Sequence, residues 1–177
     1  ENGMNNIYEF NYIHDISGDA HLYTGFSSPR CAPWSCVVQN NAFRNNVIVN
    51  AEVGVRYNTG SEASNLGFYS NTVYNVLAAM TSNNQDVPNL QIYNNINFVP
   101  AGAGHYVFWV ASPPGLLEDY NDFRQLTAPQ DIARIYVAGV PLTLAQRQAQ
   151  GFELNSLTSD PQFVGPLTGT PPTTAFR

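Results

Sequence analysis

Apolar and polar positions recur along this chain at a long period. Five segments share a pattern in which an asparagine is followed two positions later by an apolar residue, although the Asn95 segment is slightly out of step. The segments begin at Asn11, Asn46, Asn71, Asn95 and Asn121. The spacings between these anchor asparagines are 35, 25, 24 and 26 residues. A period in this range is typical of a solenoid, in which each repeat buries its apolar side by stacking on its neighbours.

A second alternation, with a period of two, lies inside each repeat. The positions seven and nine residues after the anchor are small or apolar: Gly18, Val53, Ala78 and Gly102, then Ala20, Val55, Met80 and Gly104. The interleaved positions, eight and ten residues after the anchor, are often polar. The tenth position holds His21, Arg56, Thr81 and His105. This alternation predicts one half-buried strand per repeat, with His21 and Arg56 as outward neighbours on adjacent strands.

The spacing of the repeats leaves no room for crossover helices of ten residues. We therefore predict an all-β fold, a parallel β-helix (solenoid), for residues 1–128, with each strand paired to its equivalent in the next repeat. The anchor asparagines are expected to stack as a ladder at a turn, because asparagine tolerates left-handed backbone angles and its amide bonds to the next amide. The fourth repeat can be anchored at Asn95 or at Asn94, and the second choice places Ile96 in the inward column.

The pattern changes in residues 129–177, which we assign to the same domain. A short hairpin is expected around Tyr136–Val140. A short C-terminal helix is predicted over 143–150, with Thr143 as N-cap and Gly151 as the stop. The tail from Gly165 onward, rich in Pro, Thr and Gly, is predicted to dock as a loop over one face.

Composition narrows the function classes. Charged residues make up 11% of the 177-residue chain, against roughly 25% in ordinary globular chains. Seven arginines, no lysine and a net charge of -6 argue against nucleic acid as a partner. No apolar run approaches the roughly 20 residues needed to cross a bilayer, so no membrane partner is expected. The first repeat begins within a few residues of Glu1 without an obvious cap, so we expect the remainder of a longer β-helix chain.

Two cysteines, Cys31 and Cys36, are separated by four residues, among them Pro33 and Trp34. This spacing suits a small disulfide-closed loop in an oxidising compartment, and two free thiols are the alternative. A metal site is not expected, because no second cysteine pair or spaced histidine pair completes four ligands.

The C-terminal residues carry a family resemblance. The stretch from Gly151 to Ser156, Gly-Phe-Glu-Leu-Asn-Ser, followed by Asp160-Pro161-Gln162-Phe163, resembles the closing motif of secreted right-handed parallel β-helix proteins of the pectate-lyase-like superfamily. The run from Asn11 to Gly18 is similar to a repeat common in that family. The resemblance implies a right-handed β-helix that is secreted or at the cell surface, with polysaccharide lyase or glycoside hydrolase activity. The catalytic motifs of the family do not match this sequence, so the resemblance assigns no catalytic residue.

The outward face of the first two repeats holds the most site-like residues. A lyase needs a cation against the uronate carboxylate, a base and an acid, and Arg56, His21 and Tyr23 suit these roles in that order. Asn58, Arg30 and Trp34 are expected to bind substrate beside them. The alternative interpretation is that His21 and Arg56 are ordinary cross-strand neighbours on a solvated sheet.

A hydrolase needs two carboxylates, and Asp19 and Glu52 are the alternative catalytic pair. Adjacent strands and a two-residue shift place them roughly 8 Å apart, which is within the range of inverting glycosidases. Calcium bound by Asp15 and Asp19 is a weaker alternative, so no cofactor is expected. His14 falls in a largely apolar column and is predicted to be partly buried, while Trp109 is predicted to be structural.

These observations favour an extracellular β-helix that processes a polysaccharide by lyase or hydrolase chemistry. The alternative is a non-catalytic carbohydrate-binding, adhesion or structural solenoid on a surface. Turnover separates the two classes, because a binder shows affinity without product.

Overall fold

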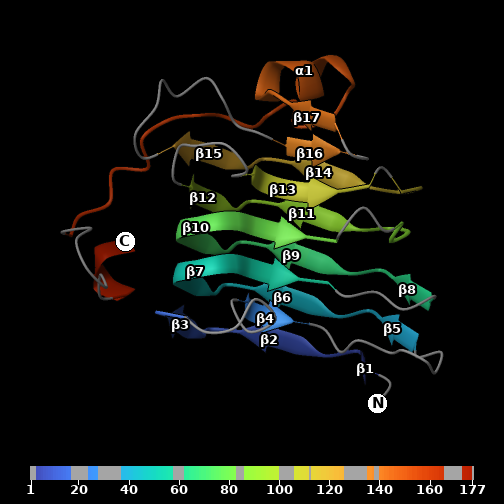
Figure 1. The fold of residues 1–177 in the computed structure, drawn as a ribbon, viewed down its shortest axis with the longest axis horizontal. Helices are drawn as coiled ribbons and strands as arrows, with labels where there is room; N and C mark the ends of the chain where they lie inside the picture. Colours follow the sequence, from blue (N-terminus) through green and yellow to red (C-terminus); the bar gives the residue numbers. More distant parts are fainter. Residues whose placement is uncertain are drawn as a thin grey trace.

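A computed structural model describes residues 3–16, 24–27, 37–57, 62–82, 86–99, 106–111, 113–125, 135–137, 140–165 and 173–176. Strands dominate the described residues, and they form three sheets (Figure 1). Every strand pair in these sheets is parallel except β16 with β17. The prediction of an all-β chain with parallel pairing is therefore confirmed.

Two of the sheets contain only short strands. In the described residues the smaller one, here the short sheet, contains β1 (Gly3–Met4), β5 (Val37–Gln39) and β8 (Glu62–Ser64). The second, here the five-stranded sheet, contains β2 (Ile7–Glu9), β6 (Ala42–Arg44), β9 (Gly67–Tyr69), β11 (Gln91–Tyr93) and β14 (Leu117–Asp119).

The third sheet has nine strands in the described residues. It has two halves, because each of its two long strands pairs along its length with two shorter strands, one in each half. The long strands are β7 (Val47–Arg56) and β10 (Thr72–Thr81). The first half adds β3 (Tyr12–His14), β12 (Ile96–Val99) and β15 (Asp122–Gln125). The second half adds β4 (Thr24–Ser27), β13 (Tyr106–Val110), β16 (Ile135–Val137) and β17 (Val140–Leu142).

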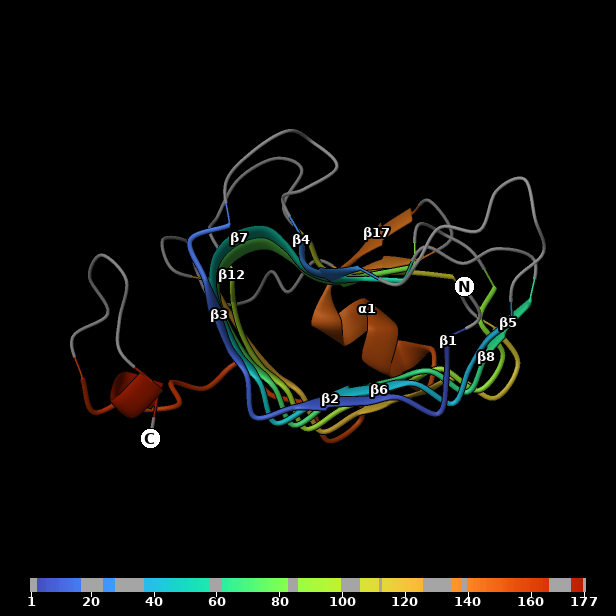
Figure 2. The same ribbon diagram turned by 90° about the horizontal axis from the view of Figure 1, so that it is seen from below.

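The long strands bend between the two halves, as β7 does in Figure 2. Asn50 and Asn75 lie in the middle of these strands with φ near 54°. Left-handed backbone is accessible to asparagine at little cost, which is why this residue type suits the bend.

The chain passes through the sheets in a recurring order. β5 of the short sheet, β6 of the five-stranded sheet and β7 follow one another, and β8, β9 and β10 repeat that sequence one layer along. Figure 2 shows the three sheets around a common interior. Each strand satisfies its backbone hydrogen bonds with the equivalent strand of the next repeat, so neighbouring repeats stabilise one another.

The core fills this interior with residues from all three sheets. In the five-stranded sheet the inward column is Tyr8, Phe43, Phe68, Ile92 and Glu118. Phe43 stacks on Phe68 with ring centres 6.3 Å apart, and Phe68 meets Phe108 of β13 edge to face at 6.4 Å. Offset and edge-to-face pairs of this kind add to the energy of apolar burial.

The fourth repeat is anchored at Asn95, because Ile96 pairs with Thr72 and Asn97 pairs with Val73. Asn97 therefore takes an inward position that is apolar in the neighbouring repeats, and its side chain is fully buried. Its Nδ2 donates to the carbonyl of Asp122 at 3.3 Å, while its Oδ1 is buried without a hydrogen-bond partner in the described part of the chain.

The C-terminal residues follow the predicted order. β16 and β17 form the antiparallel hairpin. Helix α1 (Leu144–Ala149) begins after Thr143, which forms a capping box with Gln146, and ends before Gly151 at φ 89°. The helix lies across the C-terminal end of the stack (Figures 1 and 2).

The docked tail covers the outer face of the first half of the nine-stranded sheet. Two phenylalanines pack against the column Val49, Tyr74 and Phe98. They are Phe163, and Phe176 at the end of the 3-10 helix η1 (Thr173–Phe176). Phe98 and Phe163 have ring centres 5.2 Å apart, and Tyr74 and Phe176 are at 5.8 Å. An outward apolar column is thus buried by a segment more than sixty residues away in sequence.

Candidate functional site

The outer face of the second half of the nine-stranded sheet carries the one predicted lyase residue that the structure describes, Arg56. Strand register aligns Arg56 with Ser27 on one side and Thr81 on the other. Trp109 and then Tyr136 continue the same row across β13 and β16. We refer to this row, Arg56–Thr81–Trp109, together with Tyr106, as the Arg56 face.

The predicted register of the first repeat is wrong. Thr24 pairs with Val53 where the repeat pattern predicted Gly18, and Ser27 stands opposite Arg56 where it predicted His21. The fourth repeat is displaced too, because Tyr106 and not Gly102 pairs with Ala78. The links that precede β4 and β13 have extra residues. Such insertions change the count from the anchor asparagine without changing which strands pair, because added loop residues cost little free energy.

Most of the predicted site lies outside the described residues. This holds for the catalytic candidates His21, Tyr23 and Asp19, for the binding residues Asn58, Arg30 and Trp34, and for Cys31 and Cys36. The proposed disulfide, the Asp19/Glu52 separation and calcium binding by Asp15 with Asp19 stay predictions. Glu52 is described, and it is a half-buried residue of β7.

Arg56 is partly enclosed at this face. Its residue is half-buried, and its Nε is buried without a hydrogen-bond partner among the described residues. A guanidinium carries five donors in a planar fork that suits a carboxylate, and leaving one of them buried and unpaired costs free energy. Because Arg56 as a whole is half-buried, the rest of its side chain is partly exposed at this face.

Trp109 belongs to this face and not to the core. The residues on either side of it, Phe108 and Val110, are fully buried core residues, whereas Trp109 is half-buried and lies outside the core clusters. Its ring lies 6.1 Å from that of Tyr106 at an angle of 58°. The structural role predicted for Trp109 stays a prediction, and Trp109 and Tyr106 place two aromatic residues at the row of Arg56.

His14 lies in the apolar column that the sequence predicted, but it is not partly buried there as predicted. It pairs with Val49, whose column continues through Tyr74 and Phe98. However, His14 is exposed, stacks on Tyr12 at 4.8 Å and lies 3.1 Å from a carboxylate oxygen of Asp15. The tail residues Phe163 and Phe176 bury this column over later repeats, which explains why the prediction of a partly buried histidine is wrong.

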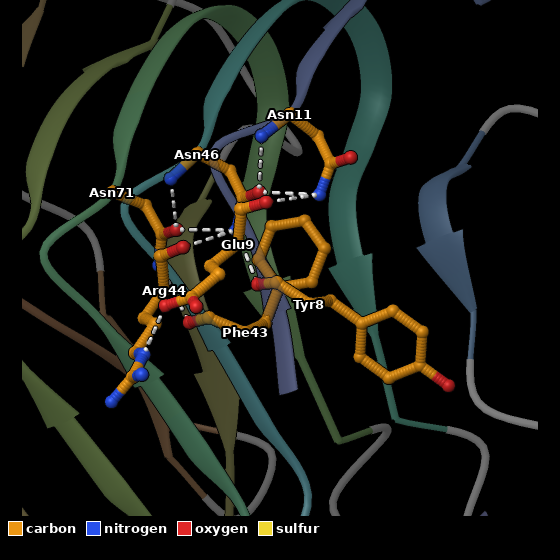
Figure 3. Close-up of polar contacts among 7 residues, drawn as sticks. All are labelled: Tyr8, Glu9, Asn11, Phe43, Arg44, Asn46 and Asn71. Carbon is orange, nitrogen blue, oxygen red and sulfur yellow. Dashed lines mark hydrogen bonds and ion pairs between the residues drawn. The ribbon is translucent and has the colours of Figure 1, made fainter. Parts of the chain in front are cut away.

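The anchor asparagines form the predicted ladder (Figure 3). The backbone N–H and the Nδ2 of each asparagine donate to the Oδ1 of the next one, at 3.0 and 2.9 Å from Asn11 to Asn46 and at 3.0 and 3.1 Å from Asn46 to Asn71. The same pair of bonds continues to Asn95 and Asn121. From Asn46 onward these residues are 1% exposed, so they hold the turn together and are closed to ligands.

The anchor asparagines were predicted to take the left-handed backbone angles of this turn, and this part of the prediction is wrong. The residue before each anchor takes them instead. Positive φ angles of 55–59° occur at Phe10, Asn45, Ser70, Asn94 and Tyr120. The anchor residue is instead selected for its amide, which supplies donors and an acceptor in the buried ladder.

A buried charged cluster at the C-terminal end escaped the sequence analysis. Arg147 of α1 donates through Nε at 3.0 Å to Glu118, and its guanidinium lies 3.8 Å from the ring centre of Phe152. Arg147 and Glu118 are 1% and 2% exposed. The available signal was Glu118 itself, an acid in the inward column of the five-stranded sheet.

Glu153 links this cluster to the ladder. Nδ2 of Asn121 donates to both carboxyl oxygens of Glu153, the hydroxyl of Ser156 donates to the same group, and the backbone N–H of Asn121 donates to Ser156 Oγ at 2.7 Å. Burial, and then the nearby charge of Glu118, raise the pKa of Glu153 to about 9. Glu153 therefore keeps its proton at neutral pH, and this closing motif acts as the last rung of the ladder.

A surface depression of about 290 Å³ lies beside that last rung. It is lined by Asn94, Asn95, Ile96, Tyr120, Asn121, Asp122, Asn155 and Leu157. Burial raises the pKa of Asp122, whose Oδ1 is buried without a hydrogen-bond partner in the described residues. Asp122 is another carboxylate that the sequence analysis missed, and after burial the nearby charge of Asp160 also raises its pKa.

Neither a metal centre nor a membrane span is found in the residues that the structure covers. No group of three or more His, Cys, Asp and Glu side chains is arranged to hold an ion there. No described helix is long and apolar enough to cross a bilayer. Comparisons of the chain with known protein families, with curated proteins and with solved structures find no match.

Proposed function

We propose that this chain belongs to a right-handed parallel β-helix, of the kind found in the pectate-lyase-like superfamily, that processes an extracellular polysaccharide. The recurring passage through three sheets, the parallel pairing of equivalent strands and the asparagine ladder support the β-helix assignment. The closing residues Glu153 and Ser156, which continue the ladder, are those on which the family resemblance rests. Fold alone does not select a reaction, so the function is argued from the Arg56 face.

The observation that carries the proposal is a half-buried arginine, Arg56, whose row across the strands continues to the half-buried Trp109. A uronate carboxylate at the exposed part of this side chain would form a charge-assisted contact with the guanidinium. Trp109 lies two strands away in the same row and offers an apolar ring against which a sugar can pack. A polysaccharide lying across the strands would contact both residues at once.

The chemistry that suits such a site is eliminative cleavage of a uronic acid glycan. Arg56 would neutralise the carboxylate and so acidify the adjacent C5–H bond. A base takes that proton, the C4–O bond breaks, a C4–C5 double bond forms, and an acid protonates the leaving oxygen. His21 as base and Tyr23 as acid remain predictions for this step, and Asp19 with Glu52 is the hydrolytic alternative.

A non-catalytic carbohydrate-binding solenoid is the second candidate. It is favoured by the scarcity of acid–base groups on the described part of this face. Among the described residues of β7, β10 and β13, Glu52 is the one carboxylate. Binding without turnover needs only the cation and the aromatic rings.

The test is to measure binding and turnover on the same acidic and neutral polysaccharides. Arg56→Gln should reduce affinity for an acidic glycan at least tenfold. Arg44→Gln is the matched control, because Arg44 pairs with Glu9 at 2.7 Å on the outer face of the five-stranded sheet. Equal affinity of the two variants would contradict the proposed face.

Product analysis then separates the chemistries. Ultraviolet absorbance rising together with reducing ends indicates a lyase, and reducing ends alone indicate a hydrolase. Saturable binding that depends on Arg56 without either product selects the non-catalytic solenoid.

A further inference from the structure

The depression of about 290 Å³ beside the last rung is built from three consecutive repeats. Strand register aligns Ile96 with Asp122, and an isolated bridge aligns Asp122 with Leu157, so these residues form one row along the depression. Asn95 and Asn121 also line it, but their side-chain amides already donate within the turn. A ligand must therefore be held by the other lining residues.

The residue directly before each of the last three rungs supplies a second row. This row is Asn94, Tyr120 and Asn155, and all three residues are exposed. Tyr120 is 60% exposed, and its side chain has no ring contact or hydrogen bond within the described residues. Leu157, on the opposite row, is 50% exposed. Exposed apolar surface that borders a hollow is typical of a binding site.

The two amides of this second row are available to a ligand. At another left-handed turn the surface asparagines bond to one another, as Asn89 does to Asn65 at 2.8 Å. The side-chain amide of Asn94, in contrast, forms no hydrogen bond with the residues that the structure describes. Asn155 donates through its backbone N–H and its Nδ2 to Asp119, both at 2.7 Å, which fixes its amide and leaves Oδ1 as an acceptor. Polar groups held in place in this way lower the entropy cost of binding.

The charge of the walls is unfavourable to an acidic ligand. Asp122 is the one ionisable acid among the described lining residues, and no arginine or histidine is among them. Asp122 is 9% exposed, so its carboxyl acts from behind the surface and not as a ligand contact. The nearby Arg124 is paired with Asp160 at 3.1 Å. A uronate placed here would meet a carboxyl group without a lining cation.

We propose that this depression binds one neutral pyranose unit of a glycan. The sugar hydroxyls exchange hydrogen bonds with the amides of Asn94 and Asn155, and the C–H face of the ring packs on Tyr120. The volume lies at the lower end of the range of about 300–1,000 Å³ for ligand pockets, so it suits a single ring.

This site is separate from the Arg56 face. Thr72 at the start of β10 aligns with Ile96, whereas Thr81 at the end of β10 aligns with Trp109. The two sites therefore lie at opposite ends of the long strands. Binding of a neutral sugar at the depression does not depend on Arg56.

Two-dimensional NMR of the full chain is the test, with the methyl glycosides of glucose, galactose and mannose as separate probes. At least one should shift the side-chain amide signals of Asn94 and Asn155 and the methyl signals of Ile96 and Leu157 along one saturation curve. The uronic acid counterpart of that sugar should bind about tenfold more weakly or less. Sorbitol, which has hydroxyls but no ring, should give no saturable shift.

Three results of these titrations would overturn the proposal. They are no saturable shift with any of the three glycosides, equal affinity for the uronic acid counterpart, and saturable shifts of the same signals with sorbitol.

Tyr120→Asn tests the ring contact. Asparagine occupies the same turn position at Asn45 and Asn94 with φ of 55°, so the backbone accommodates the change. The affinity for the glycoside should fall about tenfold, the scale of one good aromatic contact. Phe10→Asn is the matched control, because Phe10 has φ 59°, is 77% exposed and does not line the depression. Equal affinities of the two variants would contradict the assignment.

Arg56→Gln separates this proposal from the one before it. That variant should bind the neutral glycoside as wild type does, and Tyr120→Asn should keep the affinity of the Arg56 face for an acidic glycan. Loss of neutral sugar binding in Arg56→Gln would place the sugar at the Arg56 face and overturn the second site. Each proposal can therefore fail while the other stands.

Discussion

The two ends of the stack of strands differ in how they satisfy the same ladder. At the C-terminal end, Ser156 accepts the backbone N–H of Asn121 and Glu153 accepts its side-chain amide. Helix α1 covers this end, and Arg147 neutralises the inward Glu118. At the N-terminal end, Asn11 is exposed and its Oδ1 has no donor among the described residues.

The comparison shows that ending a stack requires specific chemistry. A repeat that simply stops leaves donors or acceptors unpaired, and burying them costs free energy. The C-terminal end solves this by replacing the next asparagine with a hydroxyl and a protonated carboxyl. It also needs a buried cation, because the inward column of the five-stranded sheet ends in an acid.

The largest effect is expected at the closed end. Arg147→Met leaves the Glu118 carboxylate buried without its cation, and this should reduce the free energy of unfolding by about 3–5 kcal/mol. Adding Glu118→Leu should recover most of the loss, because an apolar pair of similar volume removes the uncompensated charge. Urea unfolding of the single and double variants measures both values, and a double variant no more stable than Arg147→Met would refute this role of the ion pair.

The ladder interior should come next. Asn71→Ala removes the acceptor of two bonds from Asn46 and the donor to the carbonyl of Phe43, all in buried positions. We expect a loss of about 2–3 kcal/mol, since each unsatisfied buried group costs on the order of 1 kcal/mol or more. Thermal unfolding tests this, and a Tm within about 1 °C of wild type would show that the ladder contributes little.

A pH dependence distinguishes the closed end further. The folded-state pKa of Glu153 is about 9, against 4.5 as the ordinary value. The folded chain therefore binds more protons between these values, so this contribution to stability is complete below pH 4.5 and is lost as pH rises toward 9. At about 1.4 kcal/mol per pKa unit, this shift sets an upper limit of about 6 kcal/mol on the stability lost across the window.

Glu153→Gln tests the sign of this effect. The glutamine keeps the size and carries no charge, so the variant should lose stability less than wild type as pH rises from 5 to 9. Tm measured at several pH values in that range gives the comparison. Parallel curves for the two proteins would assign the pH dependence to other groups.

The smallest effect is expected at the open end. Asn11→Ala removes the Nδ2 bonds to Asn46 and to the carbonyl of Glu9 but leaves the backbone N–H of residue 11 in place. Because this site is exposed, the loss should be below about 1 kcal/mol. A loss as large as that of Asn71→Ala would mean that the two rungs are equivalent and would remove the contrast between the ends.

The sequence pattern predicted the repeat and its central register well. Val53 with Ala78, Val55 with Met80 and Arg56 with Thr81 pair as the count from the anchors required. The hairpin, the capped helix and the asparagine ladder also agree. These features depend on local chemistry, namely strand alternation, a capping box and an amide that pairs with its own kind.

The candidate site was less predictable for two physical reasons. Extra residues before β4 displaced the count that had paired His21 with Arg56, and extra residues before β13 displaced the fourth repeat, because loop length varies at little energetic cost. The environment of His14 depended on which repeats Phe163 and Phe176 cover. The spacing of 35 residues after Asn11 shows that the first repeat is longer, but it does not show where in the repeat the extra residues lie.

The sequence by itself determined the parallel, repeating β architecture, because a repeat of 24–35 residues can bury its apolar side only against the equivalent side of its neighbours. The tertiary structure alone decided that Asn97 lies in the core, that Trp109 lies outside it and that Arg147 closes the end of the stack. These outcomes depend on contacts between segments that are far apart in the sequence. Such contacts, and no single stretch of chain, set the burial, the charge pairing and the exposure of each side chain.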